Sequence, residues 1–257
     1  MRVLLPPSEA KRPGGRPDAG RTDHSGRTGS AAALAQARRR VAASLVEFAV
    51  SPGASAALAL PARSAAADLA ANAAVHLAPR LPAIERYSGT VYEGLSVATL
   101  TRASRTKADA AVLIFSGLWG VLRADEPVPP YRLPASAALP GLGVLATFWR
   151  PVLDDVLPDL LGDGLVVDLR STDYGAMWRP SGELRDRVVA VRVLTPFGSG
   201  PPKVISYPSK LGKGRLTRAL VSRRGVVRTV GQVVDAWRAA GGSAGAQRTD
   251  GTLELIT

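Results

Sequence analysis

The stretch AAVLIFSGLWGVLRADEPVPPYRLP, residues 110–134, joins an apolar run to a dense cluster of polar and aromatic residues. The apolar run, over residues 110–115, is typical of a strand that is buried on both faces. The Ser-Gly pair that follows predicts that Ser116 and the next backbone N–H groups lie at the end of this strand. Donor side chains at the same edge are expected from Arg123, Tyr131 and Arg132. The alternative is that the apolar residues of the stretch form core and its arginines pair with acidic loops.

Other segments alternate between helical and strand patterns. Apolar residues recur at helical spacing after Ser30, a suitable N-cap, which predicts a helix over residues 30–49. Further helices are expected over residues 64–77, 148–161, 211–222 and 229–240. Strands are expected over residues 2–5, 164–169, 188–194, 202–207 and 253–256. Because these elements interleave without a strict βαβ rhythm or a repeat, the sequence predicts an α+β fold, with a single compact domain over residues 1–257 and helices around an irregular mixed sheet.

The composition excludes several classes of protein. The 257 residues are 46% hydrophobic and 21% charged, which supports a buried core rather than disorder. The absence of cysteine excludes disulfide scaffolds, thiolate metal sites and cysteine nucleophiles. With only His24 and His76, we expect no metal centre and no cofactor. The N-terminal apolar run is too short for a signal peptide and nothing resembles a membrane span, so we expect a cytoplasmic protein without membrane contacts.

The charge is strongly positive and unevenly distributed. Lys and Arg outnumber Asp and Glu by 33 to 21, a net charge of +12, and ten basic residues but no acidic one lie between Asp186 and Asp235. We expect a basic surface loop over residues 11–29 and a basic helical region over residues 203–240. Gly212, Lys213 and Gly214 predict a turn before a helix, whose exposed N–H groups suit a phosphate. The alternative is a solvated basic face.

Several blocks of the sequence, taken together, resemble the YaaA family of peroxide-stress proteins. SGLWGVLRADEPVPPYRLP is similar to the family's SGL[WY]GVLRPxDxxxPYRL block. The other matching blocks, in the family's order, are PPSEAK at 6–11, YSGTVYEGL at 87–95, FW at 148–149, VVDLRSTDYGAMW at 166–178 and SYPSKLGKGRLTR at 206–218. The resemblance is good over residues 83–218 and weak over 12–82 and past 222, which indicates a divergent branch of actinobacterial type.

This resemblance implies a compact fold with a positively charged cleft and non-specific DNA binding through a helix-hairpin-helix-like element. It also implies protection against peroxide by limiting free iron and DNA damage. Because no iron-ligand pattern is present, any control of iron would be indirect. The hairpin would lie around residues 223–227, with Arg224 and Gly225 in contact with phosphate.

The same blocks place polar residues at strand ends and helix starts, where pockets form. The candidate catalytic residues are Asp168, Tyr174 and Ser116. The candidate anion-binding or DNA-binding residues are Arg123, Arg132, Lys210, Lys213, Arg215, Arg218 and Arg224. Further pocket residues are Lys11, Tyr92, Tyr131 and Ser171. The alternative for Asp168 is an ion pair with Arg170 or Arg123 at the strand end.

These observations leave two main functions open. One is a DNA-binding peroxide-stress protein. The other is an enzyme acting on a nucleoside, nucleotide or modified base by N-glycosidic or related chemistry, in which Asp168 would stabilise charge or take a proton, Tyr174 would donate a hydrogen bond, and Arg132 and Lys210 would hold an anion. A closed pocket joining these four residues favours the enzyme, and an open basic groove favours DNA. A structural adaptor is the third possibility.

Overall fold

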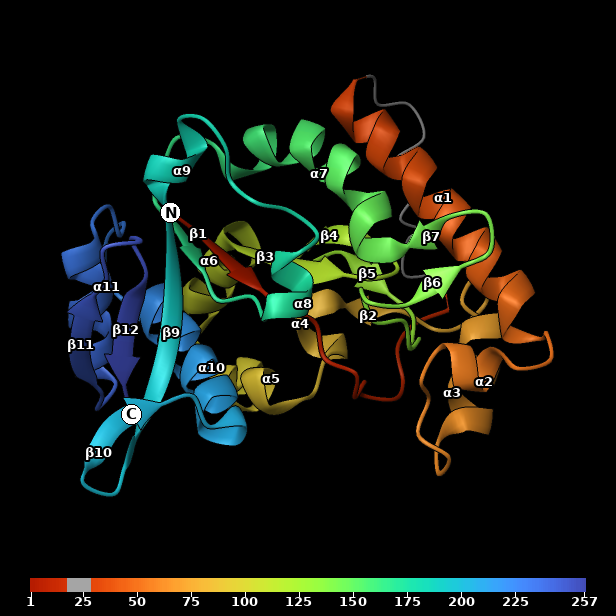
Figure 1. The fold of residues 1–257 in the computed structure, drawn as a ribbon. Coiled ribbons are helices and arrows are strands. Elements are labelled where there is room, and N and C mark those ends of the chain that lie inside the picture. The colour runs from red at the N-terminus through yellow and green to blue at the C-terminus, as the bar shows by residue number, and fades with distance from the viewer. Residues whose placement is uncertain (18–28) are drawn as a thin grey trace.

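The computed structural model describes residues 1–17 and 29–257, and its main sheet has the strand order β11-β12-β9-β8-β1-β3-β4, with β10 paired to β9 (Figure 1). The strands are β1 Arg2–Leu5, β3 Val112–Ser116, β4 Gly120–Arg123, β8 Val166–Asp168, β9 Val188–Phe197, β10 Gly200–Lys203, β11 Ser243–Gln247 and β12 Leu253–Ile256. The inner strands β12, β9, β8, β1 and β3 run parallel, whereas β4, β10 and β11 are antiparallel to their neighbours. This mixed sheet with surrounding helices confirms the predicted α+β class.

Helices cover the sheet and its edges. They are α1 Ser30–Ala49, α2 Ala54–Ala57, α3 Ala65–Ala73, α4 Ala83–Arg86, α5 Thr90–Leu95, α6 Arg102–Ala111, α7 Leu145–Leu161, α8 Thr172–Gly175, α9 Leu184–Arg187, α10 Ser206–Ser222 and α11 Val230–Ala239, with a 3₁₀ turn η1 at Val97–Thr99. Two small ribbons join β2 Leu81–Pro82 to β5 Pro127–Val128, and β6 Ala138–Leu139 to β7 Gly143–Val144. Helix α1 packs on α7, and α10 packs on α5, α6, α11 and β9 (Figure 1).

The centre of the core is the β1–β3 pair. Val3, Leu4 and Leu5 are fully buried, and all five residues of β3 are buried. The buried strand expected over residues 110–115 begins two residues later than predicted, because residues 110 and 111 end α6. The β3–β4 hairpin packs closely on α7, because Trp149 lies fully buried and donates to the carbonyl of Gly117 at 2.8 Å. In the described part of the chain, no helix is long and apolar enough to span a lipid bilayer.

The prediction of a glycine turn at residues 212–214 is wrong, because α10 runs without a break through both glycines. The glycines permit close packing instead. A Cβ atom on Gly214 would lie 1.9 Å from the carbonyl oxygen of Val91, and one on Gly94 of α5 would lie 2.2 Å from the carbonyl oxygen of Leu211. The backbones of α5 and α10 therefore approach each other more closely than any residue with a side chain would allow. No phosphate site at a helix N-terminus exists there.

Other predicted boundaries differ locally. The strand expected over residues 202–207 is wrong, since β10 ends at Lys203 and α10 begins at Ser206. The helix expected over residues 30–49 is confirmed, although Gly29 rather than Ser30 occupies the N-cap position. Helix α11 is confirmed with a capping box in which Thr229 and Gln232 bond each other's backbone N–H groups. Residues 18–28, which hold His24 and most of the expected basic loop, lie outside the described residues.

Candidate functional site

A cleft lies at the carboxyl edge of the parallel strands, where the loops after β1 and β8 meet α10. The strand order reverses at β1, because β3 and β8 both follow β1 in the sequence but pair with its opposite edges. In open α/β sheets, ligands bind outside the carboxyl ends of strands at such a reversal. Two adjoining cavities of about 390 and 780 Å³ occupy this position and share Ser171, Lys210 and Lys213. We call these two cavities together the strand-end cleft.

Many of the predicted site residues surround this cleft. The larger cavity is lined by Asp168, Ser171, Lys210 and Lys213. The smaller cavity is also lined by Tyr92 and Tyr174. A narrow recess that shares Tyr174 with the smaller cavity is lined by Lys11, Tyr131 and Arg132. The four residues proposed to meet in one site therefore lie around connected cavities, and their chemical roles remain predictions.

Asp168 forms an ion pair with Arg170 at the end of β8. Its carboxylate accepts hydrogen bonds from Arg170 at 2.7 and 2.9 Å, and a third from the Arg170 backbone N–H at 3.0 Å. The Arg170 side chain is 3% exposed, stacks on Phe115 and Trp178, and donates to the carbonyls of Tyr174 and Trp178. Arg170 and Arg123 were the two ion-pair partners considered for Asp168, and in the structure the partner is Arg170. This ion pair shapes the loop that carries Ser171 and Tyr174.

Two lysines place their ammonium groups in the walls of these cavities. Lys11 donates to the carbonyls of Ser8 at 2.8 Å and Glu9 at 3.1 Å, and it lies 4.4 Å from the centre of the Tyr131 ring. Burial lowers the pKa of Lys11 to about 7. Lys213 donates to the carbonyl of Arg170 at 2.9 Å, and burial lowers its pKa to about 8. The free-energy cost of burying each amine is smaller when the amine is neutral, or when an anion lies beside its charged form, than when the charge is unpaired.

Ser116 lies beneath the cleft rather than in its wall. It is fully buried, accepts the backbone N–H groups of Leu118 and Trp119, and lies 2.6 Å from the hydroxyl of Tyr131. The Tyr131 hydroxyl lies 2.6 Å from that of Tyr87, so three hydroxyls form one chain. Burial raises the pKa of both tyrosines, and the chain holds the floor of the recess in place.

Two predicted anion-binding arginines are paired within the protein. Arg132 pairs with Glu9 and lies 3.8 Å from Asp68, and its backbone bonds the amide of Asn72. Arg123 lies on the exposed end of β4, 3.4 Å from Asp125. Arg132 therefore contacts the recess, whereas Arg123 is not among the residues that line the cleft.

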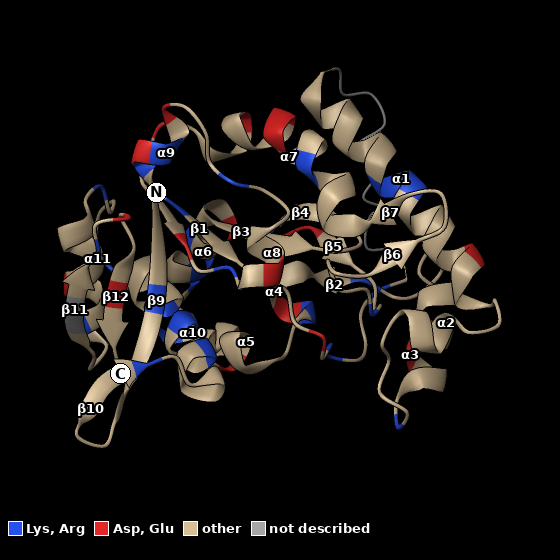
Figure 2. Cartoon of the chain, viewed as in Figure 1, with Lys and Arg blue, Asp and Glu red and all other residues tan. Residues whose placement is uncertain are grey.

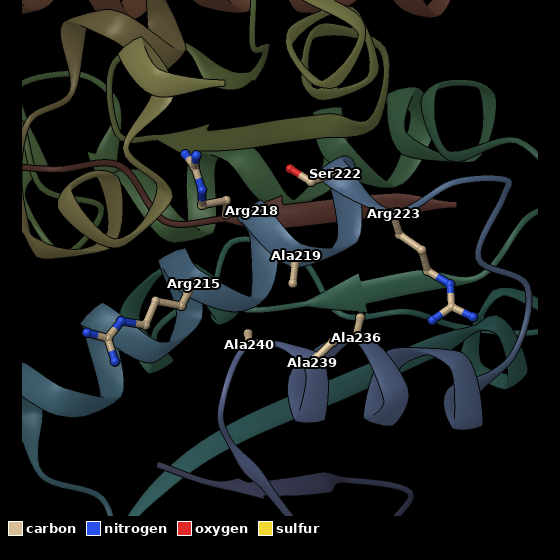
Figure 3. A pocket seen from close by; sticks show the side chains of 8 residues that line it. All are labelled: Arg215, Arg218, Ala219, Ser222, Arg223, Ala236, Ala239 and Ala240. Atoms are coloured by element: carbon tan, nitrogen blue, oxygen red, sulfur yellow. The ribbon is translucent and has the colours of Figure 1, made fainter. Parts of the chain in front are cut away.

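A separate groove of about 530 Å³ lies between α10 and α11, where the predicted arginines Arg215 and Arg218 are joined by Arg223. Figure 3 shows Ala219 of α10 facing small residues of α11, with Arg215 and Arg223 towards opposite ends. Figure 2 shows that Lys and Arg gather along α10. Arg218 also has a structural role, since it donates to the carbonyls of Leu95, Ser96 and Thr99 at 3.0–3.2 Å.

The turn between α10 and α11 is held from behind. Lys107 of α6 donates to the carbonyls of Arg223 at 2.5 Å and Gly225 at 3.0 Å. Gly225 adopts φ +76°, a conformation that favours glycine. Arg224 and Gly225 are exposed, and Val226 next to them is 61% exposed. We call α10, this turn and α11 the hairpin.

The site contains residues that reasoning from the sequence missed. Glu9 lines the recess, Arg192 lines the larger cavity of the cleft, and Arg223 lines the groove. Lys107 fixes the turn. The run of basic residues after Asp186 was the available signal for Arg192 and Arg223, but it did not separate them from their neighbours. Nothing local marks Lys107, whose acceptors lie more than 110 residues away. Among residues 1–17 and 29–257, no group of three His, Asp or Glu side chains is placed to hold a metal ion.

The buried amine of Lys11 predicts how stability changes with pH. Its pKa falls from 10.5 to about 7 on folding, so the unfolded chain binds more protons between these values and stability rises with pH from 7. The lowered pKa of Lys213 also makes stability rise with pH. The raised pKa values of the buried tyrosines make stability fall with pH, but only above pH 10. We expect Lys11→Met to reduce the gain in unfolding free energy between pH 7 and 9 by about 1–2 kcal/mol, measured by urea denaturation. An unchanged gain would contradict the assignment to Lys11.

The sequence matches known proteins over nearly its whole length. Residues 1–236 match the family described as peroxide stress protein YaaA. A UPF0246 protein of Streptomyces coelicolor is 38% identical over 242 residues, which cover 94% of this chain and 90% of that protein. A UPF0246 protein of Corynebacterium glutamicum strain R is 34% identical over 94% of this chain and 93% of its own length. One from Shewanella oneidensis is 31% identical over 55% of this chain and 56% of its own. The chain therefore belongs to the peroxide stress protein YaaA family.

Proposed function

We propose that the protein binds duplex DNA through the hairpin, without sequence preference, and that this binding serves protection against peroxide. The observation that carries the proposal is the geometry of the hairpin: arginines of α10 and of the turn line the groove between two packed helices, and Lys107 fixes the turn from behind. Guanidinium groups bind phosphate oxygens in a forked geometry, and a glycine turn lets backbone N–H groups approach a phosphate. A cytoplasmic location and a single domain over the whole chain are part of the proposal.

The hairpin suits DNA phosphates better than it suits base edges. Basic side chains dominate its polar surface, whereas Asn and Gln, which read adenine, are represented only by Gln232. The Gln232 side chain is already bonded to the backbone N–H groups of Arg228 and Thr229. Affinity should therefore come from phosphate neutralisation and counterion release, which is independent of sequence and falls with salt.

The test replaces Arg223 and Arg224 together with alanine. Both lie at the turn, and within the described residues neither side chain has a hydrogen bond or ion pair of the kind that ties Arg218 to α5. Binding to a duplex with 5′-hydroxyl ends is measured by fluorescence anisotropy between about 50 and 200 mM salt. We expect at least tenfold weaker binding on all sequences, and a slope of log affinity against log salt that is shallower by about 2.

The matched control replaces Arg39 and Arg63, two exposed arginines on α1 and before α3. It removes the same charge from a part of the molecule distant from the hairpin (Figure 1), so binding should stay within about twofold. If both double variants lose affinity equally, binding follows net charge rather than the hairpin, and the proposal fails. If the wild-type protein does not bind duplex at low salt, it fails outright.

A second candidate is an enzyme acting on a nucleoside, nucleotide or modified base. The specific observation that favours it is the connection of Asp168, Tyr174, Lys210 and Arg132 around adjoining cavities. The Asp168 carboxylate already has both oxygens on Arg170, so a catalytic role for it would require this pair to open. Asp168→Asn, assayed for release of free base from DNA and nucleosides beside the wild-type protein, tests this candidate. It is rejected if the wild-type protein releases none.

A further inference from the structure

The larger cavity of the strand-end cleft has an excess of positive charge. Its lining residues include one carboxylate, Asp168, and four cations, Arg170, Arg192, Lys210 and Lys213. Asp168 is neutralised by Arg170, and Arg192 lies 3.8 Å from Glu254, which Arg248 also approaches at 3.5 Å. Lys210 and Lys213 therefore remain as the cations of this cavity without a carboxylate at ion-pair distance among the described residues. They lie one turn apart on α10.

Lys213 is the more constrained of the two. Its ammonium group is largely buried, and one of its three N–H groups donates a hydrogen bond to the carbonyl of Arg170 at 2.9 Å. Burial is the main reason why the pKa of Lys213 is lowered; the charge of Asp168 opposes this lowering, and the neighbouring charge of Lys210 adds to it. An anion placed between the two ammonium groups would reduce the cost of keeping Lys213 protonated and accept their remaining N–H donors.

The remaining polar side chains that line the larger cavity carry hydroxyl groups. They belong to Ser171, Thr172, Ser206, Ser209 and Thr252. Hydroxyls suit the sugar and the phosphate oxygens of a ligand, because they can donate or accept. None of the described residues lining this cavity is aromatic, so it is a poor place for a base.

The smaller cavity supplies what the larger one lacks. Tyr92, Tyr174, Pro6 and Pro7 give it flat apolar walls, and Glu9 and Asp173 give it acceptors. Flat side chains stack on bases, and carboxylates accept from the exocyclic amino groups of adenine, cytosine and guanine. The two cavities meet at Ser171, Lys210 and Lys213, and each has a volume within the range of roughly 300–1,000 Å³ that is usual for small-molecule sites.

We propose that the strand-end cleft binds a nucleoside 5′-monophosphate, with its phosphate between Lys210 and Lys213 and its base against Tyr174. The phosphate is a monoester, which carries about −1.5 to −2 at pH 7, whereas each internal phosphate of DNA carries about −1. Two adjacent ammonium groups therefore select the monoester, which occurs on a free nucleotide and at the end of a DNA strand. This site is separate from the hairpin and does not rest on the DNA binding proposed above.

The first experiment is calorimetry with 2′-deoxyadenosine 5′-monophosphate, deoxyadenosine and inorganic phosphate. We expect the monophosphate to bind at least tenfold more tightly than deoxyadenosine or phosphate alone. Lys210 is exposed, so Lys210→Gln should fold and weaken monophosphate binding about tenfold, while Lys210→Arg should retain most of it. Arg39→Gln on α1 removes the same charge and should leave the affinity unchanged. Absence of monophosphate binding, equal binding of deoxyadenosine, or equal losses in Lys210→Gln and Arg39→Gln would overturn the proposal.

The second experiment identifies the source of the phosphate, using the Arg223→Ala/Arg224→Ala variant to remove hairpin binding. Duplexes with 5′-phosphate or 5′-hydroxyl ends compete against a fluorescent 2′-deoxyadenosine 5′-monophosphate. Competition by the 5′-phosphate duplex alone supports a strand-end ligand, and competition by neither supports a free nucleotide. Equal competition by both duplexes means that the cleft binds internal phosphates, which overturns the selectivity for a monoester. Loss of fluorescent nucleotide binding in this variant would also overturn the proposal, because it would show one site rather than two.

Discussion

Replacing Gly214 with alanine is expected to lower the free energy of unfolding by about 3 kcal/mol or more. The new Cβ would lie 1.9 Å from the carbonyl oxygen of Val91 and 2.7 Å from the backbone nitrogen of Leu95, and neither atom can rotate away. Helices α5 and α10 must separate, although alanine in an unobstructed helix is favoured over glycine by roughly 0.5–1 kcal/mol. Urea denaturation followed by circular dichroism measures the loss.

The matched control is Gly231→Ala in α11. This glycine is exposed, and the nearest atom to an added Cβ is the hydroxyl oxygen of Thr229 at 3.8 Å. The substitution should leave stability unchanged or raise it slightly, because only backbone entropy changes. Equal midpoints for the two variants would mean that α5 and α10 are not in close contact in solution.

Replacing Arg170 with methionine is expected to lower the free energy of unfolding by about 3–5 kcal/mol, the second large effect. The variant leaves the Asp168 carboxylate without its cation, removes donors from the carbonyls of Tyr174 and Trp178, and removes the stacking on Phe115. Asp168→Ala should also cost stability, but less, because the arginine keeps its carbonyl partners. Thermal and urea unfolding of each variant, with Arg185→Met in the exposed α9 as control, gives the values.

The double variant Asp168→Ala/Arg170→Met completes the cycle. If the two side chains form a pair in solution, the loss in the double variant is smaller than the sum of the two single losses. Additive losses would show that the pair contributes nothing. A melting temperature for Asp168→Ala equal to that of the wild-type protein would instead favour a functional role for this carboxylate.

The inner strands of the sheet could be predicted because their signal is local. The apolar residues that form β1, β3 and β8 within the predicted runs at 2–5, 110–115 and 164–169 are buried, and their polar neighbours lie at strand ends for the reason expected. This placed Asp168 and Ser171 at the cleft. Lys210 and Lys213 were indicated by the run of basic residues and by the family resemblance, but nothing in the sequence shows that the first half of α10 lies beside the end of β8.

The path of α10 could not be predicted from its residues. SYPSKLGKG is rich in residues that favour turns, and intrinsic propensity predicts a break. The helix forms because α5 packs on its glycines, a contact between residues about 120 positions apart. Arg86 illustrates the same limit: it is fully buried and donates to the carbonyls of Arg12, Gly14, Pro79 and Val128, none of which its neighbours in sequence reveal.

The central position of β1 has a consequence for synthesis on the ribosome. Residues 2–5 emerge before both of their partners, which are residues 112–114 on one side and 166–168 on the other. At about 5–20 residues per second, the second partner follows on the order of ten to thirty seconds later. For that time Val3, Leu4 and Leu5 lack a strand on at least one side, so a nascent chain of this protein should engage a ribosome-associated chaperone until β8 has emerged.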